Sequence, residues 1–212
     1  MSRPAAACDA ATLAFYEREA ERYVAAVPDW TKDYRDSFLA RLQPGAHILD
    51  LGCGGGRDAA AMIAAGFTVD ATDGSAAMAA EAEKAIGRKV RVLRFDELDA
   101  NAAYDAVWAS ASLLHVPRGE LGDALVRVHR ALKSGGLFYA SFKAGDEEGY
   151  DEFGRYYNYP DAAWLRAAYA TAGPWEEIEF STGPGTSLEG GTIDWHFVTM
   201  RKPTSEQQGT PA

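Results

Sequence analysis

An acidic residue followed by closely spaced glycines is the feature of this sequence most able to do chemistry. Asp50 precedes glycines at positions 52, 54, 55 and 56, and Arg57 follows the last of them. Glycines at such a turn let a ligand lie against the backbone, because no Cβ blocks its approach. The free N–H groups at the start of a following helix can bind a polar edge of that ligand. The turn therefore predicts a cofactor site.

Two kinds of cofactor use a turn of this type, and the sequence favours one of them. Dinucleotide sites use Gly-x-Gly-x-x-Gly, but counting from Gly52 places Arg57 where the third glycine should stand. The Asp50 carboxylate would also repel a pyrophosphate. S-Adenosylmethionine has no phosphate and carries a sulfonium and an ammonium group, which negative charge suits. We expect this cofactor, with a non-catalytic module that binds it as the alternative and an NAD(P)-dependent oxidoreductase as the less favoured one.

Asp73 is a second indication that does not depend on the glycines. It ends the second predicted strand, 23 residues after Asp50, which is about the span of one strand–helix–strand unit. A carboxylate in that place can accept hydrogen bonds from both hydroxyls of a ribose. The alternative is an Asp that only precedes a helix N-cap at Ser75.

An alternation of strands and helices must position these residues. Strands are predicted over 47–51, 67–72, 90–95, 104–110 and 137–142, with helices over 57–65, 75–86 and 118–133 between them. Two helices, near 13–27 and 31–42, precede this part, and one near 164–172 follows it. Strands over 175–181 and 193–201 are joined by the loop 183–191, which is too short for a crossover, so they should form an antiparallel hairpin.

The predicted fold class is therefore α/β, with a Rossmann-like, seven-stranded mixed sheet and helices on both faces. The sheet should be mostly parallel with an antiparallel last strand. One domain is expected overall: a helical cover over 1–44, a core over 45–202 and a disordered tail over 203–212. The charged and aromatic segment 143–159 is a candidate lid.

The segment from about 46 to 142 resembles the class I S-adenosylmethionine-dependent methyltransferases. The resemblance is carried by five motifs: Asp50–Gly56, Asp73, Arg94–Glu97, Tyr104–Ser110 and Leu132–Leu137. Within this class the chain is similar to small bacterial enzymes of the tellurite-resistance type. The resemblance implies transfer of a methyl group to a small-molecule acceptor by in-line displacement.

The resemblance also implies cofactor contacts at the ends of the first four strands. They would come from Gly52, Cys53, Gly54, Asp73, Gly74, Ser75, Arg94, Phe95, Asp96, Ala109 and Ser110. In order along the chain these would contact the methionine part, the ribose, the adenosine, the adenine ring and the sulfonium side of the cofactor. Asp50 supplies negative charge to the same site.

Three further residues are candidate cofactor contacts. Arg57 is either a surface residue or a ligand for the carboxylate of the methionine part, and we favour the ligand. Tyr16 and Tyr23 lie seven residues apart on one face of the first helix. Each alone suggests core packing, but in this family the segment often covers the cofactor, so we expect one of them to reach the site.

The acceptor side has four candidates. His115 follows the fourth strand and is either a general base or a residue that closes a loop. Lys143 follows the fifth strand, and the adjacent Tyr156 and Tyr157 lie in the candidate lid, so these residues are expected to contact substrate or to cover the sheet. No dedicated base is required if the acceptor is a thiolate, carboxylate, selenide or neutral amine.

Composition limits the other possibilities. The net charge of −10 disfavours nucleic acid as a partner. No apolar run approaches the length of a membrane span, and two cysteines without a Cys-x-x-Cys pair predict neither a disulfide nor a metal site. We expect a cytoplasmic protein that is a monomer or a small homo-oligomer.

Overall fold

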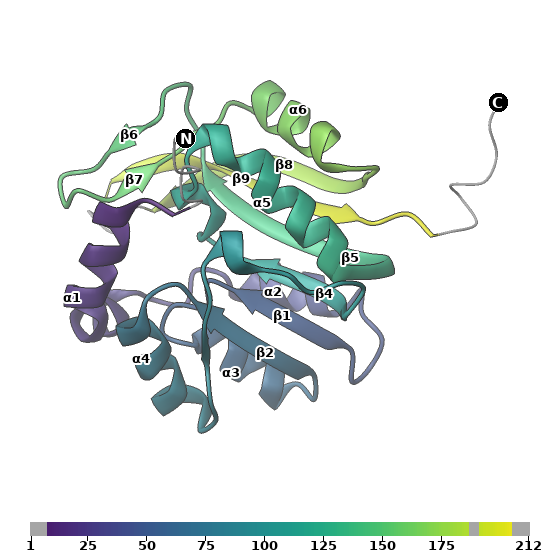
Figure 1. Ribbon diagram of the computed structural model, residues 1–212, viewed down its shortest axis with the longest axis horizontal. Helices are drawn as coiled ribbons and strands as arrows, with labels where there is room; N and C mark the ends of the chain where they lie inside the picture. Colours follow the sequence, from purple (N-terminus) through teal and green to yellow (C-terminus); the bar gives the residue numbers. More distant parts are fainter. Residues whose placement is uncertain (1–7, 187–190, 205–212) are drawn as a thin grey trace, which may run out of the picture.

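A seven-stranded mixed sheet forms the centre of the computed structural model, which describes residues 8–186 and 191–204. Its strand order is β3-β2-β1-β4-β5-β9-β8 (Figure 1). Pairing is parallel from β3 to β5, whereas β9 runs antiparallel to both of its neighbours. This confirms the predicted fold class. The strands are β1 (His47–Leu51), β2 (Thr68–Asp73), β3 (Arg91–Val92), β4 (Tyr104–Ala109), β5 (Leu132–Lys143), β8 (Glu176–Thr186) and β9 (Thr192–Arg201).

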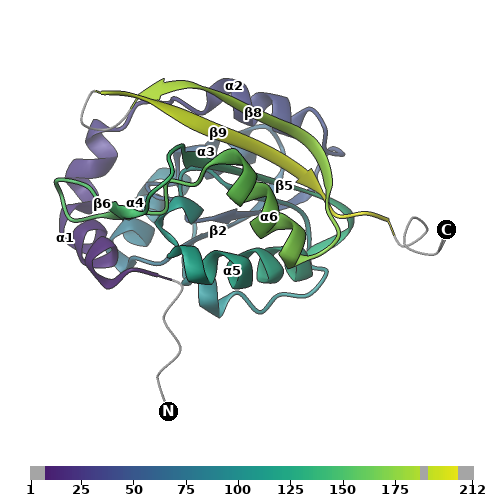
Figure 2. The ribbon, with the colours of Figure 1, turned by 90° about the horizontal axis from the view of Figure 1, so that it is seen from above.

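Helices cover both faces of this sheet. Figure 2 shows α5 and α6 on one side and α2 and α3 on the other. The helices are α1 (Ala10–Ala26), α2 (Lys32–Leu39), α3 (Arg57–Ala64), α4 (Ala76–Ile86), α5 (Arg118–Ala131) and α6 (Ala162–Ala172). Short 3₁₀ turns, η1 (Phe95–Glu97) and η2 (Leu113–His115), follow β3 and β4, and a small hairpin of β6 (Gly149–Tyr150) and β7 (Tyr156–Tyr157) follows β5.

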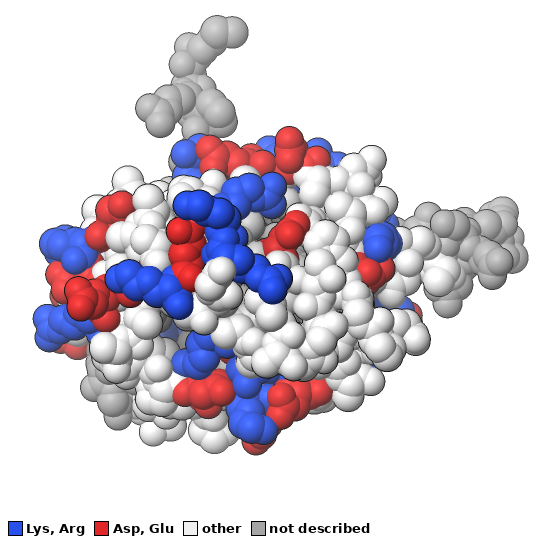
Figure 3. All heavy atoms as spheres, turned by 90° about the horizontal axis from the view of Figure 1, so that it is seen from below, with Lys and Arg blue, Asp and Glu red and all other residues white. Residues whose placement is uncertain are grey.

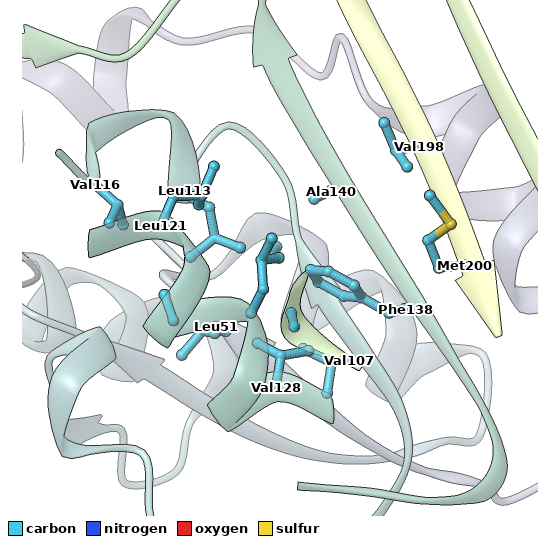
Figure 4. Close-up of a cluster of buried hydrophobic side chains, with 14 of the residues drawn as sticks. Leu51, Val107, Leu113, Val116, Leu121, Val128, Phe138, Ala140, Val198 and Met200 are labelled. Carbon is cyan, nitrogen blue, oxygen red and sulfur yellow. The ribbon is translucent and has the colours of Figure 1, made fainter. Parts of the chain in front are cut away.

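The hydrophobic core is divided by the sheet because successive strand side chains face opposite sides. In β1, Leu49 and Leu51 pack in the cluster beneath α5 and α6, which Figure 4 shows, whereas Ile48 packs beneath α2 and α3. The same alternation places Asp50 on the α3 side. Asp50 is therefore buried beneath the first turn of α3.

The largest departure from the predicted elements is at the start of β5. The helix predicted over 118–133 ends at Ala131, and Ser134-Gly135-Gly136, which lie between the predicted helix and the predicted strand, belong to β5. Register with β4 shifts between Tyr104 and Ala106, and Gly135 has a φ of +78°. The glycines therefore form a bulge in a strand that starts five residues earlier than predicted.

Smaller differences have local causes. β3 is shorter than predicted, because the Glu97 carboxylate accepts the Arg94 backbone N–H and folds the next residues into η1. β8 continues to Thr186, into the predicted loop, by pairing with β9. The rest of that loop, residues 187–190, and most of the predicted tail, residues 205–212, lie outside the described residues.

Helix α1 crosses the carboxyl ends of the parallel strands, next to α4 and the β6–β7 hairpin (Figure 1). Its Glu17 carboxylate accepts hydrogen bonds from the Ser75 hydroxyl at 2.6 Å and from the Ala77 backbone at 3.2 Å. Its Thr12 hydroxyl accepts the Tyr156 N–H at 2.8 Å. These bonds fasten α1 to α4 at one point and to the hairpin at another.

A buried ion pair fastens α2 to α3. Arg35 Nη1 lies 2.5 Å from Asp58 Oδ1, and the two side chains are 5% and 10% exposed. Thr31 donates to the same Asp58 oxygen at 2.8 Å, and the Trp108 indole N–H donates to the other at 3.0 Å. The Asp58 carboxylate is thus fully bonded and joins the N-terminal helices to the central sheet.

The surface carries charges of both signs. Figure 3 shows acidic and basic side chains intermingled on the face seen from below. None of the helices in the described part of the chain has the length and apolar content that crossing a lipid bilayer requires.

Candidate functional site

A cavity of about 490 Å³ opens at the carboxyl ends of the parallel strands, beneath α1. The rule for open α/β sheets places ligands at this edge. Its walls come from α1, the glycine turn after β1, the ends of β2 to β5, and the hairpin β6–β7. The N-terminal segment and the candidate lid thus meet over one space.

The glycines at the turn are required by backbone geometry and by close packing. Gly52, Gly54 and Gly56 have φ values of +80°, +56° and +78°. A Cβ on Gly52 would lie 2.5 Å from the Ser112 Cβ, and one on Gly56 would lie 2.9 Å from the Ala82 backbone. The loop can therefore pack against both the turn after β4 and helix α4 only if these positions are glycine.

Asp73 lies at the centre of the site and is tied to the glycine turn. Its carboxylate accepts the Gly54 N–H and the Ser75 N–H, both at 2.9 Å. Burial raises the pKa of Asp73 to about 6, while these backbone hydrogen bonds oppose the rise. Each carboxylate oxygen keeps a lone pair for a ligand hydroxyl.

Asp50 is buried beneath the same turn. Its Oδ2 has no hydrogen-bond partner among the described residues. Burial raises the pKa of Asp50 well above its usual value, and the neighbouring carboxylates of Asp58 and Asp73 raise it further. An unbonded acidic oxygen that lines a cavity favours a ligand that brings a positive charge.

Arg57 opens α3 and lines the cavity. Its guanidinium donates to the backbone carbonyls of Val27 and Pro28, in the connection between α1 and α2. Its Nε lies 3.4 Å from the Asp29 carboxylate. Arg57 is therefore at the site, where it also holds the end of the covering helix.

Most of the residues predicted from the sequence line this cavity. They are Tyr16, Tyr23, Asp50, Gly52, Cys53, Gly54, Arg57, Asp73, Gly74, Arg94, Phe95, Ser110, His115 and Lys143.

Four predicted residues do not line it. Ser75 caps α4 and is bonded to Glu17. Asp96 pairs with Arg94 at 3.2 Å, and Ala109 is fully buried in the core. The Tyr156 hydroxyl contacts Glu148 and the Arg118 backbone instead of the cavity.

Sequence reasoning missed several wall residues. Of the two lid tyrosines proposed from the sequence, Tyr157 lines the cavity and Tyr156 does not, because adjacent residues of β7 face opposite sides. Val24 and Val27, at the end of the helix predicted near 13–27, also line the cavity. Trp108 belongs to the Tyr104–Ser110 motif and Arg155 to the candidate lid, but neither was singled out as a site residue. Trp195 had no signal in its own neighbourhood, and the pairing of β9 with β5 brings it to the cavity.

The half of the cavity nearest β4 and β5 is rich in aromatic rings and cations. Lys143 Nζ lies 4.0 Å from the ring centroid of Tyr157, and the Arg155 guanidinium lies 5.4 Å from the same centroid. Ser110 Oγ and Trp195 Nε1 are buried there without a hydrogen-bond partner within residues 8–186 and 191–204. These two atoms can bond to a ligand.

Comparison with known proteins agrees with this geometry. Residues 48–136 match the family model described as a methyltransferase domain. The structure is similar to the 1,6-didemethyltoxoflavin-N1-methyltransferase of Burkholderia thailandensis, solved with bound 1,6-didemethyltoxoflavin and S-adenosylhomocysteine. The TM-score is 0.76 at 23% identity, over 96% of this chain and 93% of that one.

Two curated proteins match at the level of sequence. Hemagglutinin 1 of Eikenella corrodens is 29% identical over 163 residues, which are 72% of this chain and 52% of that protein. An uncharacterized methyltransferase of Synechocystis sp. is 33% identical over 106 residues, 46% of this chain and 47% of that protein. The chain spans about half the length of these curated relatives.

Proposed function

We propose that this protein binds S-adenosylmethionine and transfers a methyl group to a small-molecule acceptor, a proposal supported by the match of residues 48–136 to a methyltransferase family model and by the fold. The observation that carries the proposal is the pair of buried acids at the glycine turn. Asp73 is held by the Gly54 N–H, and the Asp50 oxygen lacks a partner among the described residues.

The residues present fit this cofactor and fit a dinucleotide poorly. Asp73 would accept the ribose hydroxyls, and Asp50 would face the cationic methionine part. The turn from Gly52 to Gly54 would lie against that part, because no side chain intervenes. Two buried carboxylates beside the turn would oppose a pyrophosphate.

When bound, S-adenosylmethionine would supply an electrophilic methyl group: a lone pair of the acceptor bonds to the methyl carbon, and the sulfur leaves with the electrons of the C–S bond. The contribution of this chain is then to bind, to orient and to exclude water. Helix α1 and the β6–β7 hairpin cover the cavity, and the bonds of Glu17 and Thr12 hold that cover closed.

The acceptor belongs in the half of the cavity lined by Ser110, His115, Lys143 and Tyr157. Its enclosure beneath α1 supports a small molecule, and the net charge of −10 supports a partner other than nucleic acid. Two free cysteines support a reducing, cytoplasmic setting. We also propose that the protein is a monomer or a small homo-oligomer. Within the methyltransferases, we propose that it is related to the tellurite-resistance type.

Transfer of label from methyl-tritiated S-adenosylmethionine tests the function. The protein is incubated with representative thiols, phenols, amines and azoles, and tritium is followed into the acceptor fraction. We expect transfer to a member of at least one class, and its loss in Asp73→Ala. Cofactor binding without transfer to any of these classes, or to carboxylates and selenides tested in the same way, would favour the alternative of a non-catalytic module.

A further inference from the structure

One wall of the cavity contains a chain of hydrogen bonds that runs from the Tyr16 hydroxyl through His115 to the Tyr156 backbone carbonyl. The carbonyl at its end determines which group donates in each bond. β1 and β2 carry Asp50 and Asp73, and β4 lies on the opposite side of β1 from β2. His115 follows β4, and the Tyr16 hydroxyl lies 2.9 Å from its Nε2. Tyr16 therefore belongs to the acceptor half of the cavity, opposite the carboxylate assigned to the ribose.

The other nitrogen of the imidazole sets the polarity. His115 Nδ1 lies 2.6 Å from the Tyr156 backbone carbonyl. A carbonyl oxygen only accepts, so Nδ1 must carry the proton of this bond. In a neutral ring Nε2 then carries no proton, so it can only accept a hydrogen bond.

The ring is neutral in the physiological range. His115 is buried, and burial lowers its pKa to about 3, helped by the nearby charges of Arg155 and Lys143. Nε2 therefore accepts a hydrogen bond from the Tyr16 hydroxyl. With that proton committed, the Tyr16 oxygen offers only lone pairs to the cavity. The Tyr16 and Tyr23 side chains are also hydrogen-bonded to each other. Because the Tyr16 proton faces Nε2, Tyr23 is the donor in that bond and leaves one lone pair of the Tyr16 oxygen for a ligand.

We propose that the Tyr16 oxygen recognises the methyl acceptor as a hydrogen-bond acceptor, so the molecule bound there carries an N–H or O–H group. His115 is the positioning residue that fixes this polarity. The inference rests on the proposed function, because it assigns this half of the cavity to the methyl acceptor. It separates acceptors such as phenols and N–H azoles from tertiary amines and thioethers, which have no proton to donate.

The direction of the chain can be measured without knowing the acceptor. Nitrogen-15 NMR of the ring nitrogens, assigned with His115→Gln, should show a proton on Nδ1 of His115 and none on Nε2. His196 is an internal control, because its Nε2 faces the Pro160 carbonyl and its Nδ1 faces the Thr182 hydroxyl. It should show the opposite tautomer. A proton on Nε2 of His115 would overturn the proposal.

Recognition is tested with phenol and anisole, which share a ring but differ in the O–H group. Each is titrated into the protein saturated with S-adenosylhomocysteine. Phenol should bind more tightly than anisole. The Tyr16→Phe variant should lower the affinity for phenol about tenfold and leave the affinity for anisole unchanged. Tyr150→Phe removes an exposed hydroxyl from the neighbouring hairpin and should change neither.

Each outcome decides between the two proposals. Equal affinity for the two probes, including no measurable binding of either, would overturn the role of Tyr16. So would weaker binding of S-adenosylhomocysteine to Tyr16→Phe, which would place Tyr16 at the cofactor. Failure of the wild-type protein to bind S-adenosylhomocysteine would instead contradict the proposed function itself.

Discussion

The backbone N–H of Gly54 donates to the Asp73 carboxylate at 2.9 Å, joining the turn after β1 to the end of β2. This bond connects the two motifs that predict a cofactor site from the sequence. It orients the carboxylate while leaving lone pairs open to the cavity. The turn and the acid are therefore parts of one site.

Loss of the Asp73 carboxylate should remove the hydrogen-bond pair expected with the ribose. Asp73→Ala should weaken binding of S-adenosylmethionine by about 2–3 kcal/mol, because a charge-assisted pair is lost. Calorimetry measures the change. Asp70→Ala is the matched control, since Asp70 lies in the same strand with its side chain 47% exposed and outside the cavity walls. Unchanged affinity in Asp73→Ala would exclude that residue from the site.

Cofactor binding should depend on pH through the same residue. The pKa of Asp73 is about 6, raised by burial, and only the ionised carboxylate accepts from both hydroxyls. Affinity for S-adenosylhomocysteine should therefore fall as pH drops below 6, by about tenfold at pH 5. Asp73→Asn should bind weakly with a flatter profile. A wild-type affinity that stays constant from pH 7 to pH 5 would contradict the assignment.

The glycine turn should tolerate alanine poorly where strain and crowding coincide. Gly45 and Gly52 have similar φ values, +75° and +80°, but a Cβ on Gly45 meets nothing within 4 Å. Gly45→Ala should cost about 1 kcal/mol of unfolding free energy from strain. Gly52→Ala adds a contact of 2.5 Å with Ser112 and should cost roughly 3 kcal/mol or more. Urea denaturation compares them, and equal costs would show that the close packing is unimportant.

The buried ion pair between Arg35 and Asp58 should be important for folding. Arg35→Ala leaves a buried carboxylate without its cation and should cost about 3–5 kcal/mol. Lys32→Ala breaks the exposed pair with Asp36 on the same helix, whose side chains are 64% and 54% exposed, and should change stability little. Thermal and urea unfolding measure both. Similar, small effects in the two variants would mean that α2 is held mainly by apolar packing.

The sequence predicted the parts of the fold that depend on local patterns. The apolar run of β1 and the Ser75 cap of α4 appear at the predicted residues, because each is determined by neighbours in the chain. The bulge at Gly135 was missed, since only pairing with β4 and the contact with Lys202 reveal it. Tyr156 and Tyr157 were both candidates from the sequence, but only Tyr157 lines the cavity, because adjacent residues of a strand face opposite sides.

Binding of the cofactor tests the central claim most directly. The full chain is titrated in a calorimeter with S-adenosylmethionine and, separately, with NADH. The first ligand is cationic and has no phosphate, whereas the second contains a pyrophosphate. The buried acids Asp50 and Asp73 predict saturable binding of S-adenosylmethionine at one site per chain and no measurable binding of NADH. Binding of NADH alone would contradict the account.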